Sequence, residues 1–597
     1  MKTEKEQEYL DRIAELEKQL KRTHHKIKKD TYGLHWLDVP EAFEDDVENK
    51  LPILKEVKDK AIVNDDGKPT HILIEGDNYH ALTCLNYTHK GKIDVIYIDP
   101  TYNTGKDDFR YKDKRLLDKY PDGTEVPKDH PLRHSYWLSF INKRLELAQS
   151  LLSDEGLIMI NIDDNEFAQL KILCDQLFGA NNHLMTLFVQ VRYAKKTLVE
   201  DMGYQKLLEQ VLIYGKSPFA RLKKQTKPYE IEKFNWSIKE TGNCNTIELG
   251  GKRVDIFKEG TYEIEKGEPT LDGLKEIWAS GAVLDGNSSG RFFRDYLQDR
   301  KAEDGLKTLY KVYDIGNDKF DYRYFTGPKR ANATKGKYYQ GVPNDVLENI
   351  EDYQKEKTII NYMDFSDNFG NCRHEGGIEF RSGKKPIDFL NHLLKLSLLK
   401  NKQNTVLDFF AGSGSLGHCV LENNTDSDRS DKFILITNDE NRIMSDKCYP
   451  RINNIINGWG NNSGLGNSVK YFKTAFVGEH NILGANDTDK TELAHHAGEM
   501  LAIAENTLYE MEDYQTDFYQ FFHNEKHFTA VYFREELEQF EKFREKVLAL
   551  ENSVSVYVFS WGENEFADQF DDRDDIEVKP IPQPILEVYK TIYNLSD

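Results

Sequence analysis

The amino-acid sequence predicts an α/β protein whose parallel sheet is interrupted by one large insertion. Short apolar runs that end in polar turns alternate with amphipathic helical stretches, which is the pattern of βαβ units. This alternation stops near residue 186 and resumes near residue 375. With 597 residues, the chain is also too long for a single hydrophobic core. We therefore expect several domains, one of them split by the insertion.

The first half of the α/β domain is predicted from four segments. Residues 71–74 (HILI), 92–98 (KIDVIYI) and 157–162 (LIMINI) are apolar and rich in side chains that favour strands. Between the last two, residues 137–152 have the three- and four-residue spacing of an amphipathic helix. Strands that are apolar throughout are buried on both faces, so a parallel sheet with helices on either side is expected.

The second half resumes after the insertion. Residues 386–399 are predicted to form a helix with proline in its first turn, and residues 405–407 and 433–437 are predicted strands. Residues 554–559 (VSVYVF) form a further predicted strand. The predicted domains are an N-terminal helical segment (1–60), a split α/β domain (61–185 and 375–480), the insertion (186–374) and a C-terminal α+β domain (481–597) that contacts a partner or a second copy.

Composition and charge exclude several classes of protein. The formal net charge of -22 argues against a protein that coats nucleic acid, because phosphate binding needs a cationic surface, but it leaves room for a local basic site. Six scattered cysteines lack the spacing of zinc ligands, so no metal site and reduced thiols are expected. Neither a signal peptide nor a membrane span is recognisable. We expect a cytoplasmic protein that does not enter a membrane.

A polar loop, Asp99 to Gly105, directly follows the predicted strand 92–98. Ligands of open parallel sheets bind beyond the carboxyl ends of the strands, so this loop is expected to meet a substrate. The Asp99 carboxylate and the Pro100 carbonyl could accept both hydrogens of an aromatic amine such as adenine N6 and so make its nitrogen a better nucleophile. Tyr102 could stack on a base rotated out of a duplex. By itself, the Asp-Pro pair is equally compatible with an ordinary turn.

A glycine-rich loop begins at Asp408, after a second predicted strand. Gly412 and Gly414 allow a tight turn and a close approach of the backbone to a nucleotide-like ligand. The loop lacks the lysine of a P-loop, but residues 412–417 (GSGSLG) match the dinucleotide pattern GxGxxG literally, so an oxidoreductase has to be considered. That class of enzyme carries the motif early in its domain, whereas here the motif comes late.

Five short motifs follow one another along the predicted α/β domain. They are 98–105 (IDPTYNTG), 109–113 (FRYKD), 153–166 (SDEGLIMINIDDNE), 380–386 (FRSGKKP) and 407–415 (LDFFAGSGS). In this order they resemble the motifs of beta-group amino-methyltransferases, most closely those of the modification (Mod) subunit of type III restriction-modification systems. The resemblance implies a Rossmann-like, S-adenosylmethionine-dependent DNA adenine-N6 methyltransferase domain with circularly permuted motif order and an α+β target-recognition insertion.

The resemblance also implies roles for individual residues. Two of these assignments have a structural alternative, since Asp77 with Asn78 could serve only as a helix cap and Lys385 could be a solvated residue of a first helical turn. The implied catalytic residues are Asp99, Pro100, Thr101 and Tyr102, and the implied cofactor-binding residues are Asp77, Asn78, Lys385, Pro386, Asp408, Phe409, Phe410, Ala411, Gly412, Ser413, Gly414 and Glu440.

The sequence departs from the family pattern at two places. Thr101 replaces the second proline that is usual in the catalytic loop, so a less rigid but still active loop is expected. The acidic residue that binds the cofactor ribose has no clear match, because Thr437 occupies the strand end. Asp439 or Glu440 is expected to take that role.

The insertion is expected to read the DNA sequence through basic and aromatic side chains. The alternative is a solvated loop whose aromatic residues form a local core. The resemblance further implies double-stranded DNA as substrate, a homodimer, and a separate ATP-dependent restriction (helicase-nuclease) subunit, because the chain carries no helicase or nuclease motif of its own. The predicted DNA-binding residues are Arg323, Lys329, Arg330, Lys335, Lys337 and Tyr338.

Two other functional hypotheses remain open from the sequence. The first keeps the enzyme class but makes the protein a solitary adenine-N6 or cytosine-N4 DNA methyltransferase without a restriction partner; cytosine-N4 loops more often begin with serine than with aspartate. The second is a nucleotide-binding oxidoreductase or a non-catalytic DNA-binding module. Cofactor binding separates the second from the others, and the presence of a helicase-like partner separates a restriction system from a solitary enzyme.

Overall fold

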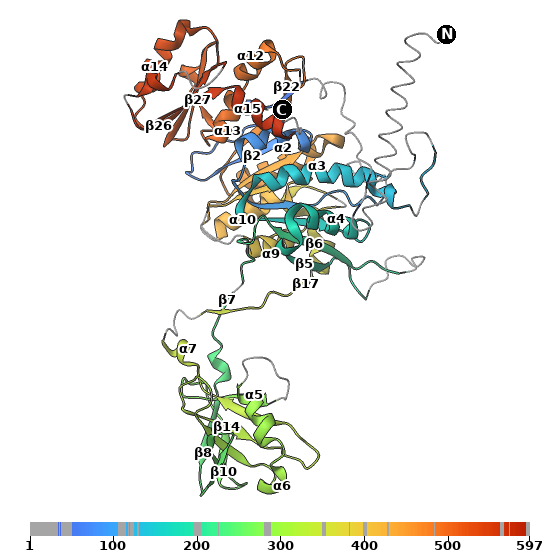
Figure 1. The fold of residues 1–597 in the computed structure, drawn as a ribbon, viewed down its shortest axis with the longest axis vertical. Coiled ribbons are helices and arrows are strands. Elements are labelled where there is room, and N and C mark those ends of the chain that lie inside the picture. Colours follow the sequence, from blue (N-terminus) through green and yellow to red (C-terminus); the bar gives the residue numbers. More distant parts are fainter. Residues whose placement is uncertain are drawn as a thin grey trace, which may run out of the picture. The chain divides into compact units, whose positions relative to one another are not determined.

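The protein, as a computed structural model, divides into two compact units (Figure 1). The first unit comprises Met1–Lys223 and Ile360–Asp597, and the second Lys224–Ile359. Residues 1–33 of the predicted N-terminal helical segment (1–60) and the motif 109–113 lie outside the described residues, whereas residues 51–56 of that segment form a strand of the main sheet instead of a helix. The structure describes residues 34, 36, 50–104, 115–116, 119, 124–127, 130–195, 204–224, 226–279, 288–348, 354–380, 383–397, 403–426, 429–482, 484–561, 566–571 and 573–592.

The first unit is built on a ten-stranded mixed sheet in the order β1-β22-β2-β19-β18-β3-β4-β6-β5-β17. From β22 to β4 all neighbours are parallel, whereas β1 pairs with β22, and β6 with both β4 and β5, in antiparallel fashion. The strands are β1 (Leu51–Glu56), β2 (Thr70–Glu75), β3 (Ile93–Ile98), β4 (Leu152–Ile162), β5 (His183–Gln190), β6 (Leu208–Gly215), β17 (Tyr362–Asp364), β18 (Thr405–Asp408), β19 (Lys432–Thr437) and β22 (Ser468–Val477).

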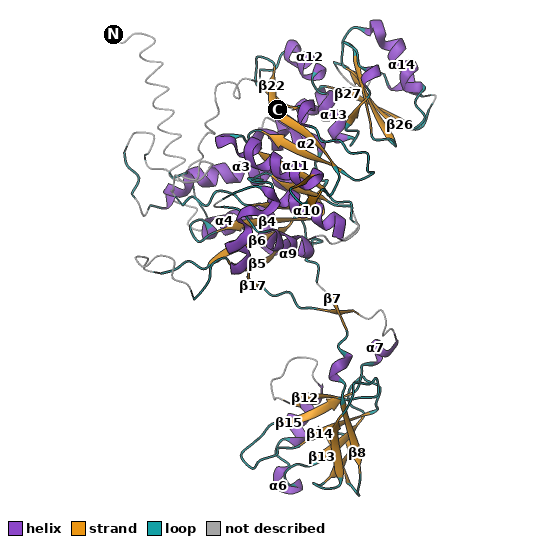
Figure 2. Cartoon of the chain, turned by 180° about the vertical axis from the view of Figure 1, so that it is seen from behind, coloured by secondary structure: helices purple, strands orange, loops and turns teal. Residues whose placement is uncertain are grey.

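Helices cover both faces of this sheet, as the two opposite views in Figures 1 and 2 show. Successive side chains of a strand point to opposite faces, so Ile96 of β3 packs in one hydrophobic core and Val95 in the other. None of the described helices is long and apolar enough to span a bilayer. On the first face lie α2 (Asn78–Thr88), α3 (Ser135–Leu151) and α4 (Phe167–Cys174), and on the second α9 (Ile387–Ser397), α10 (Ser415–Asp426) and α11 (Tyr449–Asn457).

The C-terminal part of the first unit has its own five-stranded sheet, in the order β23-β24-β25-β26-β27. One face of this sheet carries α14, while the other shares the core that contains α2 and β1. The Tyr589 hydroxyl donates a hydrogen bond of 2.7 Å to the Pro52 carbonyl, which ties the last helix to β1. The elements are α12 (Asp487–His495), α13 (Gly498–Ala504), β23 (Tyr509–Glu510), β24 (Tyr519–His523), β25 (His527–Tyr532), α14 (Phe540–Leu548), β26 (Ser553–Phe559), β27 (Ile576–Ile581) and α15 (Gln583–Ile592).

The second unit is formed mainly by antiparallel strands. Its six-stranded sheet has the order β12-β15-β14-β13-β10-β9, and β8 pairs with β11 in a separate ribbon. The elements are β7 (Thr226–Pro228), β8 (Trp236–Glu240), β9 (Asn245–Leu249), β10 (Lys252–Phe257), β11 (Tyr262–Lys266), β12 (Lys275–Ala279), α5 (Ser288–Phe292), α6 (Lys301–Asp304), β13 (Leu309–Tyr313), β14 (Tyr322–Thr326), β15 (Gly336–Gln340), α7 (Asn344–Glu348) and β16 (Gln354–Glu356).

The predicted α/β fold class is confirmed. The second unit, Lys224–Ile359, contains fewer residues than the insertion of residues 186–374 predicted from the sequence. Most of β5, together with β6 and β17, lies within that range, yet these strands belong to the ten-stranded sheet. β5 and β6 pair in antiparallel fashion, and β17, which comes after the second unit, adds to β5 in parallel, so these strands do not form βαβ units. The βαβ rhythm is therefore lost before the sheet ends.

A fully buried arginine joins the glycine-rich loop to the helices that follow it. Arg451 of α11 donates hydrogen bonds to the Ser415 hydroxyl at 2.5 Å and to His418 Nδ1 at 3.1 Å. Its guanidinium also lies 3.5 Å from the Glu375 carboxylate. Burial lowers the pKa of Arg451 to about 10, so the group is charged at neutral pH. The start of α10 is thus anchored by one cation from α11.

We predict that Arg451→Met destabilises the first unit by about 3 kcal/mol, because it removes one partner of a buried charged network. Urea unfolding followed by circular dichroism measures the change. Arg442→Met is the matched control: this arginine is 73% exposed and, among the described residues, forms an ion pair with Asp446 alone, so its loss is expected to change stability by less than about 1 kcal/mol. Equal unfolding midpoints for the two variants would contradict the anchoring role.

Candidate active site

The two predicted loops meet at one edge of the sheet, because β3 and β18 are neighbours. Val95 pairs with Val406 and Ile96 with Leu407 in parallel register. Asp99 follows the last residue of β3, and Asp408 is the last residue of β18. Two loops separated by about three hundred positions in the sequence therefore leave the sheet side by side, at the carboxyl ends of the strands.

Asp99 lies in a buried cluster of charged and polar side chains. The Tyr102 hydroxyl is 2.7 Å from Asp99 Oδ1 and 3.0 Å from Glu209 Oε2, and can donate to either carboxylate. Lys385 Nζ lies 3.1 Å from Asp99 Oδ1 and 3.0 Å from Glu209 Oε2, and donates to the Tyr102 hydroxyl at 2.7 Å. Asn161 Nδ2 donates to Glu209 at 2.8 Å. The Lys385 ammonium therefore forms ion pairs with both carboxylates, and all three charged groups lie around the Tyr102 hydroxyl.

Burial and charge have opposite effects within this cluster. Burial raises the pKa of Asp99, and the Lys385 ammonium is the largest influence that opposes this rise. Glu209 is also buried, but the charge and hydrogen bond of Lys385, together with hydrogen bonds from Asn161 and Tyr102, hold the pKa of this carboxyl below its ordinary value. The two carboxylates in turn raise the pKa of Lys385 against the effect of burial. Lys385 is thus the charge on which the ionised state of Asp99 depends.

The position of Lys385 corrects the prediction that it lines the cofactor site. It precedes α9, and its ammonium points to the catalytic loop because two carboxylates attract it there. Two members of the cluster, Glu209 on β6 and Asn161 on β4, were not predicted from the sequence. Asn161 interrupts the apolar run 157–162, and Glu209 precedes the apolar residues of β6, so a polar residue within a buried strand was the available signal.

A pocket, here called the strand-end pocket, opens between the catalytic loop and the glycine-rich loop. Gly412 has φ +51°, a left-handed conformation that suits glycine, and the amide of Phe410 donates to Asp408 Oδ1 at 2.9 Å. Burial raises the pKa of Asp408 well above its ordinary value. The lining residues are Gly76, Asp77, Asn78, Asp99, Thr101, Arg115, Phe140, Phe409, Phe410, Gly412, Thr437, Asn438, Glu440 and Ile443.

The pocket brings together half of the residues predicted to bind the cofactor. Glu440 lies on its wall with Thr437, whereas Asp439 does not line it. The amide of Ala411 donates to the Ile436 carbonyl, and the Ser413 hydroxyl faces Arg451, so these two residues hold the loop in shape. The predicted residues that line the pocket are Asp77, Asn78, Phe409, Phe410, Gly412 and Glu440, and those that do not are Lys385, Pro386, Asp408, Ala411, Ser413 and Gly414.

Asp77 and Asn78 are both a helix start and a pocket wall. Asp77 caps α2 by accepting a hydrogen bond of 2.7 Å from the Tyr79 amide. It also pairs with the fully buried Arg144 at 3.2 Å, and Asn78 donates to the Phe409 carbonyl at 2.9 Å. The sequence left open whether these two residues cap a helix or line a ligand site, and the structure shows that they can do both.

The segment around Tyr102 is held by neighbouring side chains. Trp137 Nε1 donates to the Thr101 carbonyl at 2.7 Å, and Thr101 is itself buried. Asn103 has φ +56° and donates to Glu166 Oε1 at 2.6 Å. His134 Nδ1 lies 2.7 Å from the same oxygen, so the carboxylate joins the loop to the start of α3.

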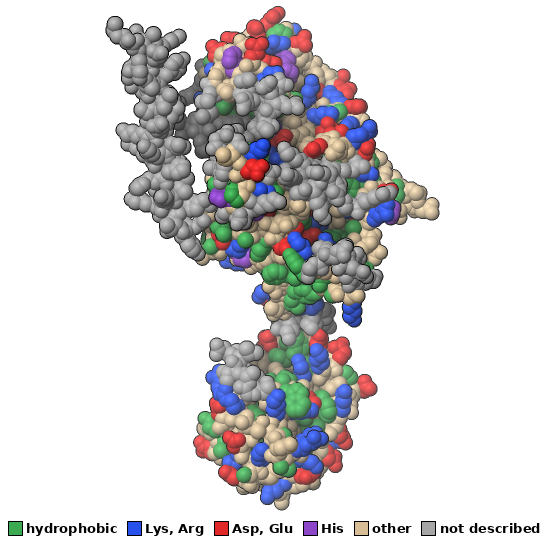
Figure 3. All heavy atoms as spheres, turned by 90° about the vertical axis from the view of Figure 1, so that its right-hand side faces the viewer, with side chains coloured by type: hydrophobic (Ala, Val, Ile, Leu, Met, Phe, Trp, Pro, Cys, Tyr) green, Lys and Arg blue, Asp and Glu red, His purple; other side chains and the backbone are tan. Residues whose placement is uncertain are grey.

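In the second unit, the residues predicted to bind DNA fall into two groups. Arg323 is buried and pairs with Asp318, and Tyr338 is buried in the core against Phe325, so neither is available to DNA in this conformation. Both face inward because alternate residues of β14 and β15 pack beneath the sheet. Figure 3 shows lysine and arginine side chains beside apolar ones on one face of this unit. Lys329, Arg330 and Lys335 are exposed, and Lys337 is half-buried.

Comparison with known proteins identifies the family. A family model described as DNA methylase matches residues 93–445, which is more than half of the chain. The chain belongs to this DNA methylase family. The match begins at β3 and continues past the glycine-rich loop, so it includes both loops of the strand-end pocket.

Individual relatives are similar at lower identity. The chain is 27% identical over 446 residues to the EcoPI Mod subunit, a type III restriction-modification enzyme of Escherichia phage P1; the match covers 69% of this chain and 64% of the relative. For the EcoP15I Mod subunit of Escherichia coli, the identity is 28% and the coverage 69% and 65%. The type II methyltransferase M.KpnI of Klebsiella pneumoniae is 27% identical, with coverage of 60% and 79%. The chain thus spans slightly less than two thirds of the two Mod subunits.

The Glu166–His134 pair predicts a pH-dependent contribution to stability. The hydrogen bond to Glu166 raises the pKa of His134 in the folded protein. The contribution is therefore complete below the ordinary histidine pKa and is lost as pH rises through the raised value. Glu166→Gln should lower the unfolding free energy more at about pH 6 than at about pH 8.5, as measured by urea unfolding.

Glu587→Gln provides the control for this measurement. Glu587 accepts a hydrogen bond from Gln583 on the same helix and is not paired with a histidine among the described residues. Its effect on stability should be the same at both pH values. A pH-independent effect of Glu166→Gln would show that the charge of His134 does not contribute.

Proposed function

We propose that this DNA methylase transfers a methyl group from S-adenosylmethionine to N6 of an adenine rotated out of double-stranded DNA. One observation carries the proposal: the Asp99 loop and the glycine-rich loop line the same pocket at the carboxyl ends of β3 and β18. A methyl donor in that pocket would be next to the carboxylate that activates the acceptor. The similarity to Mod subunits supports the role of modification and recognition subunit in a type III restriction system.

The strand-end pocket fits the chemistry of S-adenosylmethionine. Phe409 and Phe410 offer apolar surface, Glu440 offers a carboxylate for ribose hydroxyls, and Gly412 lets the backbone approach closely. Asp99 is also part of the lining. When bound, the cofactor supplies a methyl group made electrophilic by its sulfonium.

In the proposed reaction, the side chains of this chain orient the adenine and withdraw its proton. The Asp99 carboxylate and the Pro100 carbonyl accept the two hydrogens of N6, which localises the lone pair of the nitrogen. The Tyr102 ring stacks on the extruded base, while its hydroxyl is held by Glu209 and Lys385. Asp99 must be ionised to act in this way.

The partners in this proposal come from the type III context. We propose a homodimer and a separate ATP-dependent restriction subunit that cuts DNA. Lys329, Arg330, Lys335 and Lys337 of the second unit would contact DNA, whereas the buried Arg323 and Tyr338 would not. All six cysteines are unpaired, which fits a cytoplasmic protein. The second candidate is a methyltransferase that works without a helicase-like restriction subunit; the similarity to M.KpnI, a type II methyltransferase, is the reason to consider it, and co-purification of a helicase-like subunit would distinguish the two.

Asp99→Ala should abolish methyl transfer while leaving cofactor binding largely intact. The variant removes the acceptor for N6, but the glycine-rich loop and Glu440 remain. Incorporation of labelled methyl into DNA measures the reaction, and calorimetry with S-adenosylmethionine measures binding. Methylation-sensitive sequencing of DNA from cells that express the wild type then identifies the modified base and its sequence context. Near-normal labelling by the variant would refute the assigned role of Asp99.

Lys385→Met should shift the pH dependence of methyl transfer towards higher pH. Lys385 is the largest influence that lowers the pKa of Asp99, so its loss raises that pKa and the carboxyl loses its proton only at a higher pH than in the wild type. An opposite charge at this distance typically changes a carboxyl pKa by about 1 to 3 units, and the rising limb of kcat should move by a similar amount.

The neighbouring lysine is the matched control for this experiment. Lys384 is equally buried, but its ammonium donates to the Glu375 carbonyl at 2.8 Å, away from Asp99. Lys384→Met should leave the midpoint of the pH profile in place, even if it lowers stability. A Lys385→Met profile that is reduced in height but unshifted would mean that Lys385 only supports the local structure.

A further inference from the structure

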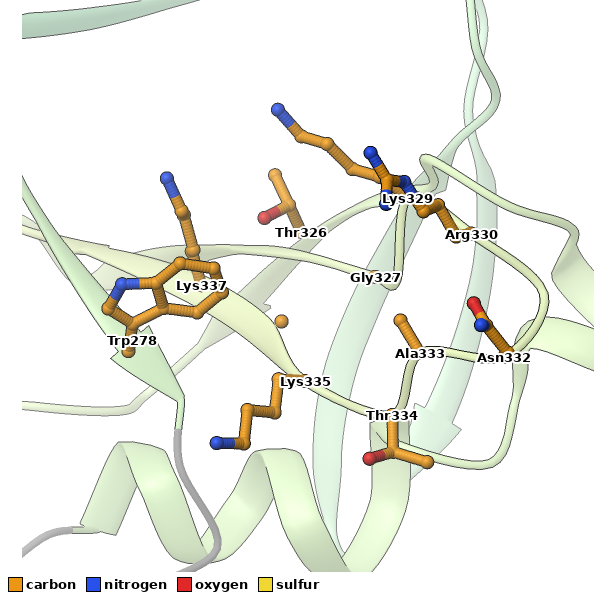
Figure 4. A pocket seen from close by; sticks show the side chains of 11 residues that line it. Trp278, Thr326, Gly327, Lys329, Arg330, Asn332, Ala333, Thr334, Lys335 and Lys337 are labelled. Carbon is orange, nitrogen blue, oxygen red and sulfur yellow. The ribbon is translucent and has the colours of Figure 1, made fainter.

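The second unit contains a cationic pocket around an exposed tryptophan, here called the Trp278 pocket (Figure 4). Its volume is about 460 Å³, within the usual range for ligand sites. Trp278 is 61% exposed, which is unusual for so large an apolar side chain. The pocket is lined by Trp278, Thr326, Gly327, Lys329, Arg330, Asn332, Ala333, Thr334, Lys335, Gly336 and Lys337.

The pocket is assembled from adjacent parts of one sheet. Trp278 of β12 is the register partner of Lys337 on β15, and the Lys337 ammonium lies 4.8 Å from the centre of the indole ring. The opposite wall is the loop between β14 and β15. Lys301 anchors this loop by donating to the carbonyls of Ala331 at 2.8 Å and Ala333 at 3.0 Å. The loop is therefore positioned before any ligand arrives.

The charge of the pocket contrasts with that of the whole chain. Among the residues that the structure describes, four lysine or arginine residues line it and no carboxylate does, although the chain carries a net charge of -22. Lys337 is paired with Glu276, whereas Lys329, Arg330 and Lys335 have no ion pair with any residue that the structure describes. Three uncompensated cations beside an exposed aromatic ring fit a ligand that is both planar and anionic.

We infer that the Trp278 pocket binds an unpaired nucleotide of the DNA on which the proposed methyltransferase acts. This inference rests on the proposed function for its choice of DNA. The base would stack on the indole, and the flanking phosphates would contact Lys329, Arg330 and Lys335. Asn332 and Thr334, on the pocket wall, offer polar groups to the base edge.

The nucleotide is expected to be unpaired because the exposed indole ring needs a free base face on which to stack. Within a duplex, both faces of each base are covered by its neighbours, so an indole ring has no face on which to stack. A base that has left the stack has a free face and is carried between phosphates that reach the surrounding cations. Base-aromatic stacking is tolerant of sequence, because every base has such a face. The pocket would therefore hold a displaced nucleotide without selecting its identity by stacking alone.

The test uses the full chain and its tryptophan fluorescence, which stacked bases quench. The probes are the single strand dT10, a duplex with one unpaired thymidine, the same duplex fully paired, and thymidine monophosphate. For dT10 and the bulged duplex, Trp278→Ala should weaken binding about tenfold and remove the quenching due to this residue. Trp278→Phe should remove that quenching while largely retaining affinity. The paired duplex should bind independently of Trp278. The mononucleotide, which lacks the flanking phosphates, should quench the indole much less than dT10 does.

A second variant and a matched control keep the test decisive. Lys335→Ala should weaken dT10 binding and flatten its dependence on salt without touching the indole. Trp561→Ala is the control, because Trp561 is also exposed and has Lys490 5.8 Å from its ring, but it lies in the C-terminal sheet region. Its replacement should leave dT10 affinity unchanged. Circular dichroism melting verifies that each variant is folded.

Three outcomes would overturn the inference. First, if Trp278→Ala binds dT10 as tightly as the wild type does, the indole does not stack on a base. Second, if binding of the fully paired duplex depends on Trp278 as much as binding of dT10 does, the residue contacts a groove of the duplex. Third, if thymidine monophosphate quenches the indole as strongly as dT10 does, the pocket is a site for free nucleotides. Methyl incorporation is measured separately with the same preparations. If methyl transfer is absent while dT10 binding depends on Trp278, the proposed function fails; if transfer is normal without this dependence, only the pocket inference fails.

Discussion

The register between β3 and β18 is the constraint on which the candidate site depends. Two backbone pairs, Val95 with Val406 and Ile96 with Leu407, bring the carboxyl ends of these strands together. Side-chain direction alternates along a strand, so a slip of one residue would turn Asp408 away from its present face and separate the two loops. The apolar cores on both sides of the sheet make such a slip costly, because each would then receive the other's side chains. The packing of the apolar cores on both faces of the sheet therefore determines which side chains meet at the pocket.

The cluster around Tyr102 is held by a balance of charge in a small buried volume. Two carboxylates and one ammonium leave a single net negative charge, and each polar hydrogen of Tyr102, Asn161 and Lys385 has a nearby acceptor. Buried charges are stable only when they are paired and hydrogen-bonded, so these residues depend on one another. The contacts of Asp99 with Tyr102 and Lys385 both involve Oδ1. In the proposed reaction, Oδ2 can therefore accept a hydrogen bond from the entering base while Lys385 stays paired with Oδ1.

Much of the fold and part of the site could be predicted from the sequence. Continuous apolar runs such as 157–162 indicated buried parallel strands. Asp99 and Gly412 could be predicted as site residues because each lies in a loop that follows such a strand. Glu209 could not be assigned, because nothing local indicates that β6 pairs beside β4. The burial of Arg323 could not be predicted either. Alternation along β14 gives two faces, and only the packing of α5 on one face and of β8 and β11 on the other shows that both are covered.

The second unit begins and ends in a short antiparallel ribbon, where Thr226 pairs with Glu356 and Pro228 with Gln354. Its two ends therefore emerge side by side, and the strands that precede and follow it need to bridge only the width of that ribbon. The entropy of closing a loop grows slowly with its length, so the ten-stranded sheet is affected little by how much chain lies beyond the ribbon. The second unit can therefore change in sequence or length during evolution without altering the strand register that holds Asp99 beside the glycine-rich loop.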